Sequence, residues 1–213
     1  MSYSLVIFDL DGTLVDSFPW FQLRLNDVAD RYGFRRVEEK EIEALRHAST
    51  LEILAHLRVP RWKLPFIARH MRRLKTEHAA TIPLFAGVDA MLHSLADAGL
   101  RLALVSSDTE RNAREKLGAL SALFSEFNCT ASIFGKAAKF RRVLRRARVE
   151  RARAIAIGDE TRDIEAARTV GIACGSVTWG YAAPAALRAR RPDLVFERME
   201  DIGRVLLNGS TGA

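Results

Sequence analysis

Two carboxylates follow a short apolar run near the start of the chain, and their spacing suits acid–base or metal chemistry. Residues Leu5–Phe8 predict a buried strand of a parallel sheet, and Asp9 and Asp11 come directly after it. Side chains alternate along a strand, so both acids would share one face, and Gly12 would let the backbone turn there. Two crowded carboxylates repel each other unless a cation lies between them or one keeps its proton.

Two plainer interpretations of this segment are a calcium loop and a solvated turn. An EF-hand loop needs an acid at its fifth position, a glycine at its sixth and a glutamate at its twelfth. This chain has Thr13, Leu14 and Trp20 at those positions, so we exclude that loop. A simple turn stays open on these residues alone, because short motifs also occur by chance.

Polar side chains also follow two later predicted strands, and a loop that carries two lysines lies between those strands in the chain. In open α/β sheets, ligands bind where the strands end, so these side chains would meet at one edge of the sheet. Taken singly, each fragment is equally well explained as a helix cap, a turn or a surface loop. The fragments are Ser106, Ser107 and Asp108 after residues 102–105, Lys136 and Lys139 in the loop, and Asp159, Glu160, Arg162 and Asp163 after residues 154–157.

In this order, the fragments resemble the motifs of the haloacid dehalogenase superfamily, and within it the phosphoglycolate phosphatase group. Together with the helical segment after the first motif, they cover nearly the whole chain. The match is specific for the superfamily and much less specific for the substrate. The matching pieces are Asp9-Leu10-Asp11-Gly12-Thr13, Ser106, Lys136 and Gly158-Asp159-Glu160-Thr161-Arg162-Asp163.

The resemblance implies a magnesium-dependent phosphatase that works through an aspartyl-phosphate. Asp9 would be the nucleophile, and Asp11 would protonate the leaving oxygen and then activate water. Magnesium would be held by Asp9, the carbonyl of Asp11 and Asp159. Asp163 would lie beyond the direct metal ligands or reach the metal through a water molecule.

The resemblance also implies which residues bind the phosphoryl group and the rest of the substrate. Ser106 and Lys136 would bind the phosphoryl oxygens, and Lys139 is the alternative lysine because the loop is shorter here than in many relatives. Further substrate contacts are predicted at Gly12, Thr13, Ser107, Arg46 and His47. Arg46 and His47, together with Ser49, fall in a break between two predicted helices, where an exposed loop is an equally good interpretation.

The fold class that the patterns predict is α/β. Strand and helix patterns alternate in residues 82–213, which predicts a Rossmann-like parallel sheet with helices on both faces. A short strand is expected near residues 132–134, and the last strands are expected at residues 173–178 and 194–196. Residues 17–81 show only helical periodicity, so we expect a small helical cap inserted after the first strand, with residues 1–16 and 82–213 forming the core. The cap would close over the site and admit small phosphomonoesters.

Composition limits the remaining classes. The 213 residues are 48% hydrophobic and 28% charged, which is ordinary for a globular protein, and no apolar stretch is long enough for a bilayer span. We expect a cytoplasmic protein with two unpaired cysteines, Cys129 and Cys174.

The net charge of +7 favours anionic ligands. Most of the excess lies in an arginine-rich segment, residues 141–153, which is interpreted as the solvated face of an amphipathic helix and not as a nucleic-acid site.

Several alternatives stay open or are disfavoured. A sugar phosphomutase of the same superfamily would carry the same motifs, and a non-catalytic polyanion-binding protein would use the basic surface. A dehalogenase would lack the acid that Asp11 represents. A phosphonate hydrolase needs a cap lysine at the site, and Lys40, Lys63 and Lys75 show no evident loop position that faces the core. The expected partner is a small phosphorylated metabolite, with no nucleic acid or membrane, for a monomer or dimer.

Overall fold

A six-stranded parallel sheet forms the centre of the computed structural model, which describes residues 3–129 and 135–208. The strand order is β3-β2-β1-β4-β5-β6, and every neighbouring pair is parallel. The strands are β1 (Leu5–Phe8), β2 (Arg101–Ser106), β3 (Phe124–Cys129), β4 (Ala154–Gly158), β5 (Ala173–Val177) and β6 (Leu194–Phe196). The predicted α/β class with a parallel sheet is confirmed.

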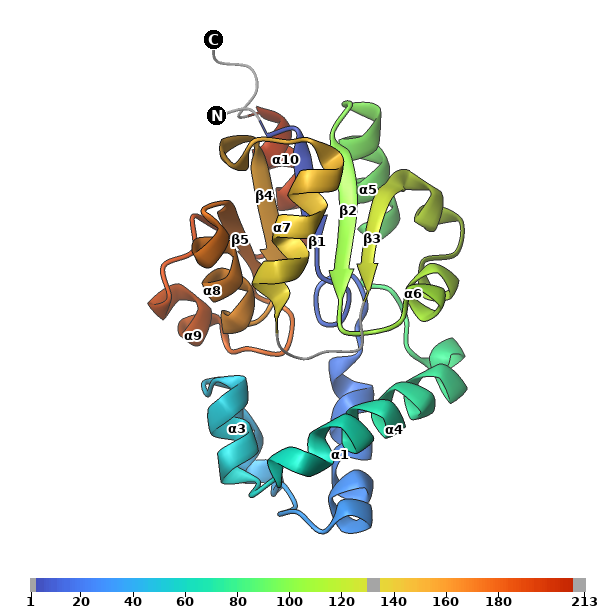
Figure 1. Cartoon of the computed structure of the whole chain (residues 1–213), viewed down its shortest axis with the longest axis vertical. Coiled ribbons are helices and arrows are strands. Elements are labelled where there is room, and N and C mark those ends of the chain that lie inside the picture. The colour runs from blue at the N-terminus through green and yellow to red at the C-terminus, as the bar shows by residue number, and fades with distance from the viewer. Residues whose placement is uncertain (1–2, 130–134, 209–213) are drawn as a thin grey trace.

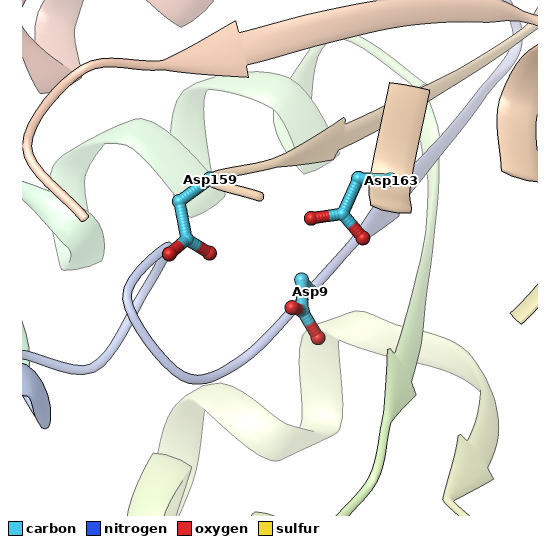
Figure 2. A group of neighbouring side chains, drawn as sticks. All are labelled: Asp9, Asp159 and Asp163. Atoms are coloured by element: carbon cyan, nitrogen blue, oxygen red, sulfur yellow. The ribbon is translucent and has the colours of Figure 1, made fainter. Parts of the chain in front are cut away.

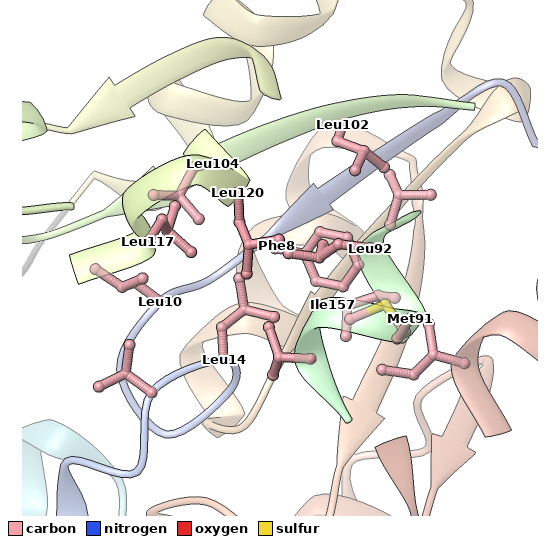
Figure 3. Packing of buried hydrophobic residues seen from close by; sticks show 14 of the residues in the cluster. Phe8, Leu10, Leu14, Met91, Leu92, Leu102, Leu104, Leu117, Leu120 and Ile157 are labelled. Carbon is pink, nitrogen blue, oxygen red and sulfur yellow. The ribbon is translucent and has the colours of Figure 1, made fainter. Parts of the chain in front are cut away.

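Helices cover both faces of the sheet, because successive residues of each central strand point to opposite sides. Val6 and Phe8 of β1 join one apolar cluster, which Figure 3 shows around Phe8, and Leu5 and Ile7 join the other. The first cluster packs under α5 (Val88–Asp97), α6 (Glu110–Leu117) and α10 (Met199–Asn208), and the second under α7 (Lys136–Ala147), α8 (Thr161–Val170) and α9 (Pro184–Ala189). The central strands are thereby held from both sides.

Four further helices lie beyond the edge toward which the strand arrows point (Figure 1). They are α1 (Phe18–Tyr32), α2 (Ile42–Arg46), α3 (Thr50–His56) and α4 (Leu64–Glu77). Gly33 ends α1 in the left-handed conformation, at φ 65°. Ser49 begins α3 with a capping box, because its hydroxyl accepts from the Glu52 amide while the Glu52 carboxylate accepts from the Ser49 amide. The hydroxyl of Ser49 is therefore used to start a helix.

Two elements differ from the sequence expectations. Strand β3 was not predicted, and the strand expected near residues 132–134 lies outside the described residues. β3 is an edge strand that places polar residues such as Glu126 in its middle, so it lacks the continuous apolar run of a buried strand. Helix α10 was not predicted either. It carries Gly203, a poor helix former, at a point where a larger side chain would press on Ser94 of α5.

The expectations for the surface and the cysteines hold in the described residues. In α7, Phe140, Val143 and Leu144 are buried while the arginines between them are exposed, as an amphipathic helix requires. Cys129 and Cys174 are both free. None of the helices within residues 3–129 and 135–208 has the length and apolar content to cross a bilayer.

Candidate active site

The two central strands end in carboxylates that face each other across the middle of the sheet. Asp9 follows β1 and Asp159 follows β4, and these strands are direct neighbours. The chain runs from β1 outward to β3 and then returns to β4, so the order of the strands reverses between β1 and β4. Such a reversal is where open α/β sheets bind ligands. Asp9 is 6% exposed and Asp159 is fully buried.

Asp163, in the first turn of α8, completes a group of three buried carboxylates. One oxygen from each of Asp9, Asp159 and Asp163 lies within 4.8 Å of the others, and Figure 2 shows the three side chains around one common space. Burial raises the pKa of Asp9 to about 6, against the opposing effect of Lys136. Burial, and then the neighbouring acids, raise the pKa of Asp159 well above its ordinary value. Three buried carboxylates that crowd together repel one another unless positive charge lies between them. Carboxylate oxygens are also the ligands that magnesium prefers, so this group fits a divalent cation of the magnesium type.

Asp159 is held by a tightly packed shell. The Thr13 hydroxyl donates to one carboxylate oxygen and the Tyr181 amide to the other, both at 2.8 Å. Gly12 has φ +75°, and a Cβ at Gly12 or Gly180 would overlap the Asp159 carboxylate. Thr13 was predicted to contact substrate, but its hydroxyl points to Asp159 instead. Thr13 is therefore placed to hold the Asp159 carboxylate in position.

A lysine ammonium lies directly against the expected nucleophile. Lys136 is the first residue of α7, and its Nζ is 2.8 Å from Asp9 Oδ2 and in contact with Asp163 Oδ1. The second oxygen of Asp163 accepts from the Glu160 amide at 3.0 Å. Burial alone would lower the pKa of Lys136, but Asp163 and Asp9 outweigh it and raise that pKa. Lys136 is therefore a fixed positive charge beside Asp9.

The second candidate lysine points elsewhere. Lys139 Nζ donates to the carbonyl of Ser106 at 2.7 Å, and burial, followed by repulsion from Lys136, lowers its pKa to about 8. The Ser106 hydroxyl, at the end of β2, accepts from the Asp108 amide at 3.0 Å. Of the two lysines, the geometry favours Lys136 for a group bound at Asp9.

Asp11 is not part of this group of three carboxylates and meets a lysine from the helical segment. Lys75 Nζ is 2.6 Å from Asp11 Oδ1, 2.7 Å from Asp11 Oδ2 and 2.9 Å from Asp108 Oδ2. The Lys75 side chain is only 12% exposed. Burial lowers its pKa, but Asp11 and Asp108 reverse this effect, so the amine stays protonated. A Schiff base needs a free amine, whereas Lys75 is held here as an ion pair by Asp11 and Asp108.

Lys75 faces the core, although no evident loop position there was predicted from the sequence. Lys75 extends from α4, a helix and not a loop. Ile67, Met71 and Lys75 follow each other at intervals of four, so they share one face of α4, and all three line a cavity beneath the helical segment. The signal in the sequence was a lysine on a helix face that otherwise carries apolar residues. Asp108 was placed at the sheet edge from sequence, but its ion pair with Lys75 was not predicted, and Thr109 is the residue that caps α6.

The two predicted substrate contacts on the helical segment have different surroundings. Arg46 donates to the carbonyls of Tyr181 and Gly180 at 3.1 and 3.2 Å, while its own carbonyl accepts from the Ala183 amide at 2.8 Å. Arg46 thus ties α2 to the loop after β5. The His47 side chain is 49% exposed and lies 3.6 Å from Glu43. Among the described residues, His47 makes no hydrogen bond or ion pair with the group of three buried carboxylates, whereas Ser107 lines the same cavity as Asp11.

Comparisons with known proteins agree with this geometry. A family model described as haloacid dehalogenase-like hydrolase matches residues 6–177. A phosphoglycolate phosphatase from Synechococcus elongatus is 32% identical over 199 residues, which is 92% of this chain and 94% of that protein. A predicted phosphatase from Clostridium acetobutylicum has TM-score 0.83 at 18% identity, covering 98% of this chain and 100% of that one. A haloacid dehalogenase-like family hydrolase from Streptococcus pneumoniae has TM-score 0.78 at 22% identity, covering 95% and 98%.

Proposed function

This chain belongs to the haloacid dehalogenase-like hydrolase family, and we propose that it is a magnesium-dependent phosphatase that cleaves a small phosphomonoester through an aspartyl-phosphate. The Lys136 ammonium between Asp9 and Asp163 is the observation that carries the proposal. A phosphate dianion repels a bare carboxylate, so a carboxylate nucleophile needs positive charge beside it. Phosphoglycolate, after which the Synechococcus elongatus relative is named, is the first compound to assay.

The proposed reaction uses three side chains of the chain itself. An Asp9 oxygen bonds to phosphorus as the bond between phosphorus and the leaving oxygen breaks, and Asp11 gives that oxygen a proton. Asp11 then takes a proton from water, whose oxygen displaces Asp9 and releases inorganic phosphate. Lys136 holds the phosphoryl oxygens throughout. Magnesium bound by Asp9, Asp159 and Asp163, with the carbonyl of Asp11, would add positive charge at the same oxygens.

The helical segment, residues 17–81, is proposed to act as a cap over this reaction. Its contacts with the core include Lys75 against Asp11 and Asp108, and Arg46 against the loop after β5. A closed cap excludes water from the acyl phosphate until the leaving group has gone. Residues 1–16 and 82–213 are proposed as the core that it covers.

Phosphate release is the experiment that tests the proposed function. Purified protein is incubated with a panel of phosphomonoesters, with magnesium or with EDTA, and inorganic phosphate is measured. We expect release with magnesium and none with EDTA. A phosphomutase would keep the phosphoryl group in its product, and a polyanion-binding protein would release nothing, so either result would contradict the proposal.

Magnesium should also stabilise the fold, independently of activity. At a concentration about 100 times its dissociation constant, we expect magnesium to raise the melting temperature by roughly 5–10 °C. Asp159→Asn should remove most of this shift, because Asp159 is one of the three clustered carboxylates. Asp97→Asn changes an exposed acid on α5 and is the matched control. An unchanged shift in Asp159→Asn, measured by scanning calorimetry, would count against the metal site.

Lys75→Met is expected to lower kcat/KM by roughly tenfold to 100-fold, because Asp11 would lose the cation that orients it. Lys63→Met is the matched control on the cap, because Lys63 Nζ donates to the Tyr32 carbonyl and is not an ion-pair partner of Asp11. It should stay within about twofold of the wild type. The measurement is phosphate release under saturating magnesium. Equal kinetics for the two variants would exclude a positioning role for Lys75.

A further inference from the structure

The helical cap encloses a cavity that opens onto the catalytic edge of the sheet. Its volume is about 360 Å³. Asp11 and Ser107 line the end next to the core. Apolar side chains from the cap line most of the remainder, among them Phe21 of α1, Ile53 of α3 and Met71 of α4. The cavity is thus continuous with the place where the leaving group of a phosphomonoester would lie.

The cap helices direct apolar side chains toward this cavity, and these side chains are not fully packed against other parts of the protein. Helices α2, α3 and α4 contain no fully buried residue, although each contributes apolar side chains to the cavity lining. Protein interiors are normally close-packed, so apolar side chains around a hollow lack the contacts that they would otherwise make. An apolar group that enters the hollow would supply those contacts and leave water.

Most cations on the cavity wall are already engaged. Lys75 is held by Asp11 and Asp108, Arg46 by two backbone carbonyls, and Arg162 by Glu160. In the part of the chain that the structure describes, Arg72 is the lining cation for which no ion pair is found. An anionic organic group would therefore have at most one open partner, while the rest of the wall around it is apolar.

We propose that the substrate is a phosphomonoester with a predominantly apolar organic part, such as an alkyl or aryl phosphate. This inference rests on the proposed function and narrows its substrate class. The phosphoryl group would meet Asp9 and Lys136, and the organic part would fill the cavity. An Asp9 oxygen bonds to phosphorus as the bond from phosphorus to the ester oxygen breaks, Asp11 gives the ester oxygen a proton, and an apolar alcohol or phenol leaves. Phosphoglycolate, with two carbons and a carboxylate, would leave much of the cavity unfilled.

A series of esters with equal charge and increasing length tests this inference. Phosphate release is measured with magnesium for ethyl, butyl and hexyl phosphate and for phosphoglycolate. We expect kcat/KM to rise about threefold to fourfold per methylene, which is roughly 100-fold between ethyl and hexyl phosphate. A preference for phosphoglycolate with no rise along the alkyl series would overturn the inference and leave the proposed function intact.

A binding measurement separates the inference from catalysis. Alkylphosphonates have a carbon–phosphorus bond that the proposed reaction does not cleave, so calorimetry can compare ethylphosphonate with hexylphosphonate. Hexylphosphonate should bind roughly 100-fold more tightly. If no ester releases phosphate, the proposed function fails, yet tighter binding of hexylphosphonate would still support the cavity assignment. Equal affinity of the two phosphonates would refute the assignment.

Filling the cavity provides a third measurement. Ala68 of α4 lines the cavity, whereas Ala44 of α2 is exposed and does not line it. Ala68→Phe should lower the ratio of hexyl to ethyl phosphate hydrolysis at least about tenfold, because the new ring occupies the space of the alkyl chain. Ala44→Phe should preserve the ratio. Identical ratios in the two variants, with both folded by circular dichroism, would contradict the proposal.

Discussion

Asp9→Asn is expected to lower kcat for phosphomonoester hydrolysis by at least about 10³-fold. The amide keeps the size of the carboxylate, but its neutral carbonyl oxygen is a far weaker nucleophile toward phosphorus than a carboxylate oxygen. Asp9 is also the acid in contact with the Lys136 ammonium, so the substitution alters the position at which the phosphoryl group would bind. The measurement is single-turnover phosphate release with saturating magnesium.

The Asp9→Asn variant should keep its fold, which makes the test interpretable. Lys136 retains Asp163 as an ion-pair partner. Burial raises the pKa of Asp9 to about 6, so the folded protein without metal holds this proton more tightly than the unfolded chain does. Ionised Asp9 therefore lowers stability as the pH rises through 6, and asparagine removes that effect. At pH 7.5 in EDTA, the melting temperature should not fall below that of the wild type.

A matched control for this result is Asp27→Asn, which changes an acid on α1 whose side chain is 67% exposed and lies 3.4 Å from Arg24. It should hydrolyse phosphomonoesters at the wild-type rate, because exposed ion pairs contribute little. Full activity of a folded Asp9→Asn protein would rule out the nucleophile and, with it, the aspartyl-phosphate.

The central part of the site was predictable because local patterns determine it. The apolar run of β1 ends at Asp9 and that of β4 ends at Gly158, so both strand ends could be placed from sequence. Parallel strands that end in polar residues bring those residues to one edge, which is what the structure has for Asp9 and Asp159. The motif resemblance added the order of the pieces and the choice of Lys136.

Contacts across the cap were not predictable in the same way. Lys75 reaches Asp11 across 64 positions in the chain, and this contact depends on how α4 lies against the core. The periodicity of a helix shows which face is apolar, but not which neighbour that face meets. The same limit applies to Arg46, which was expected at the substrate but holds two backbone carbonyls of the loop after β5. Side-chain partners in a tertiary contact follow from packing, which no short pattern encodes.

The second large effect is expected from Lys136→Met, which should lower kcat/KM by about 10²–10³-fold. Methionine keeps an unbranched apolar stem like that of lysine but removes the charge that faces Asp9. The phosphoryl oxygens would then lose one of their fixed positive partners, while the phosphate dianion would still be repelled by Asp9. Phosphate release at saturating magnesium measures the change.

Lys139→Met is the comparison that makes this result specific. Lys139 is equally part of α7, but its ammonium donates to the Ser106 carbonyl and not to Asp9. Its loss should leave a buried carbonyl short of a donor, which would lower the melting temperature by roughly 3–8 °C. Its effect on kcat/KM should stay below about tenfold, since the charge beside Asp9 is retained. If Lys139→Met proves the less active of two folded variants, the assignment of Lys136 as the phosphate-binding lysine would be overturned in favour of Lys139.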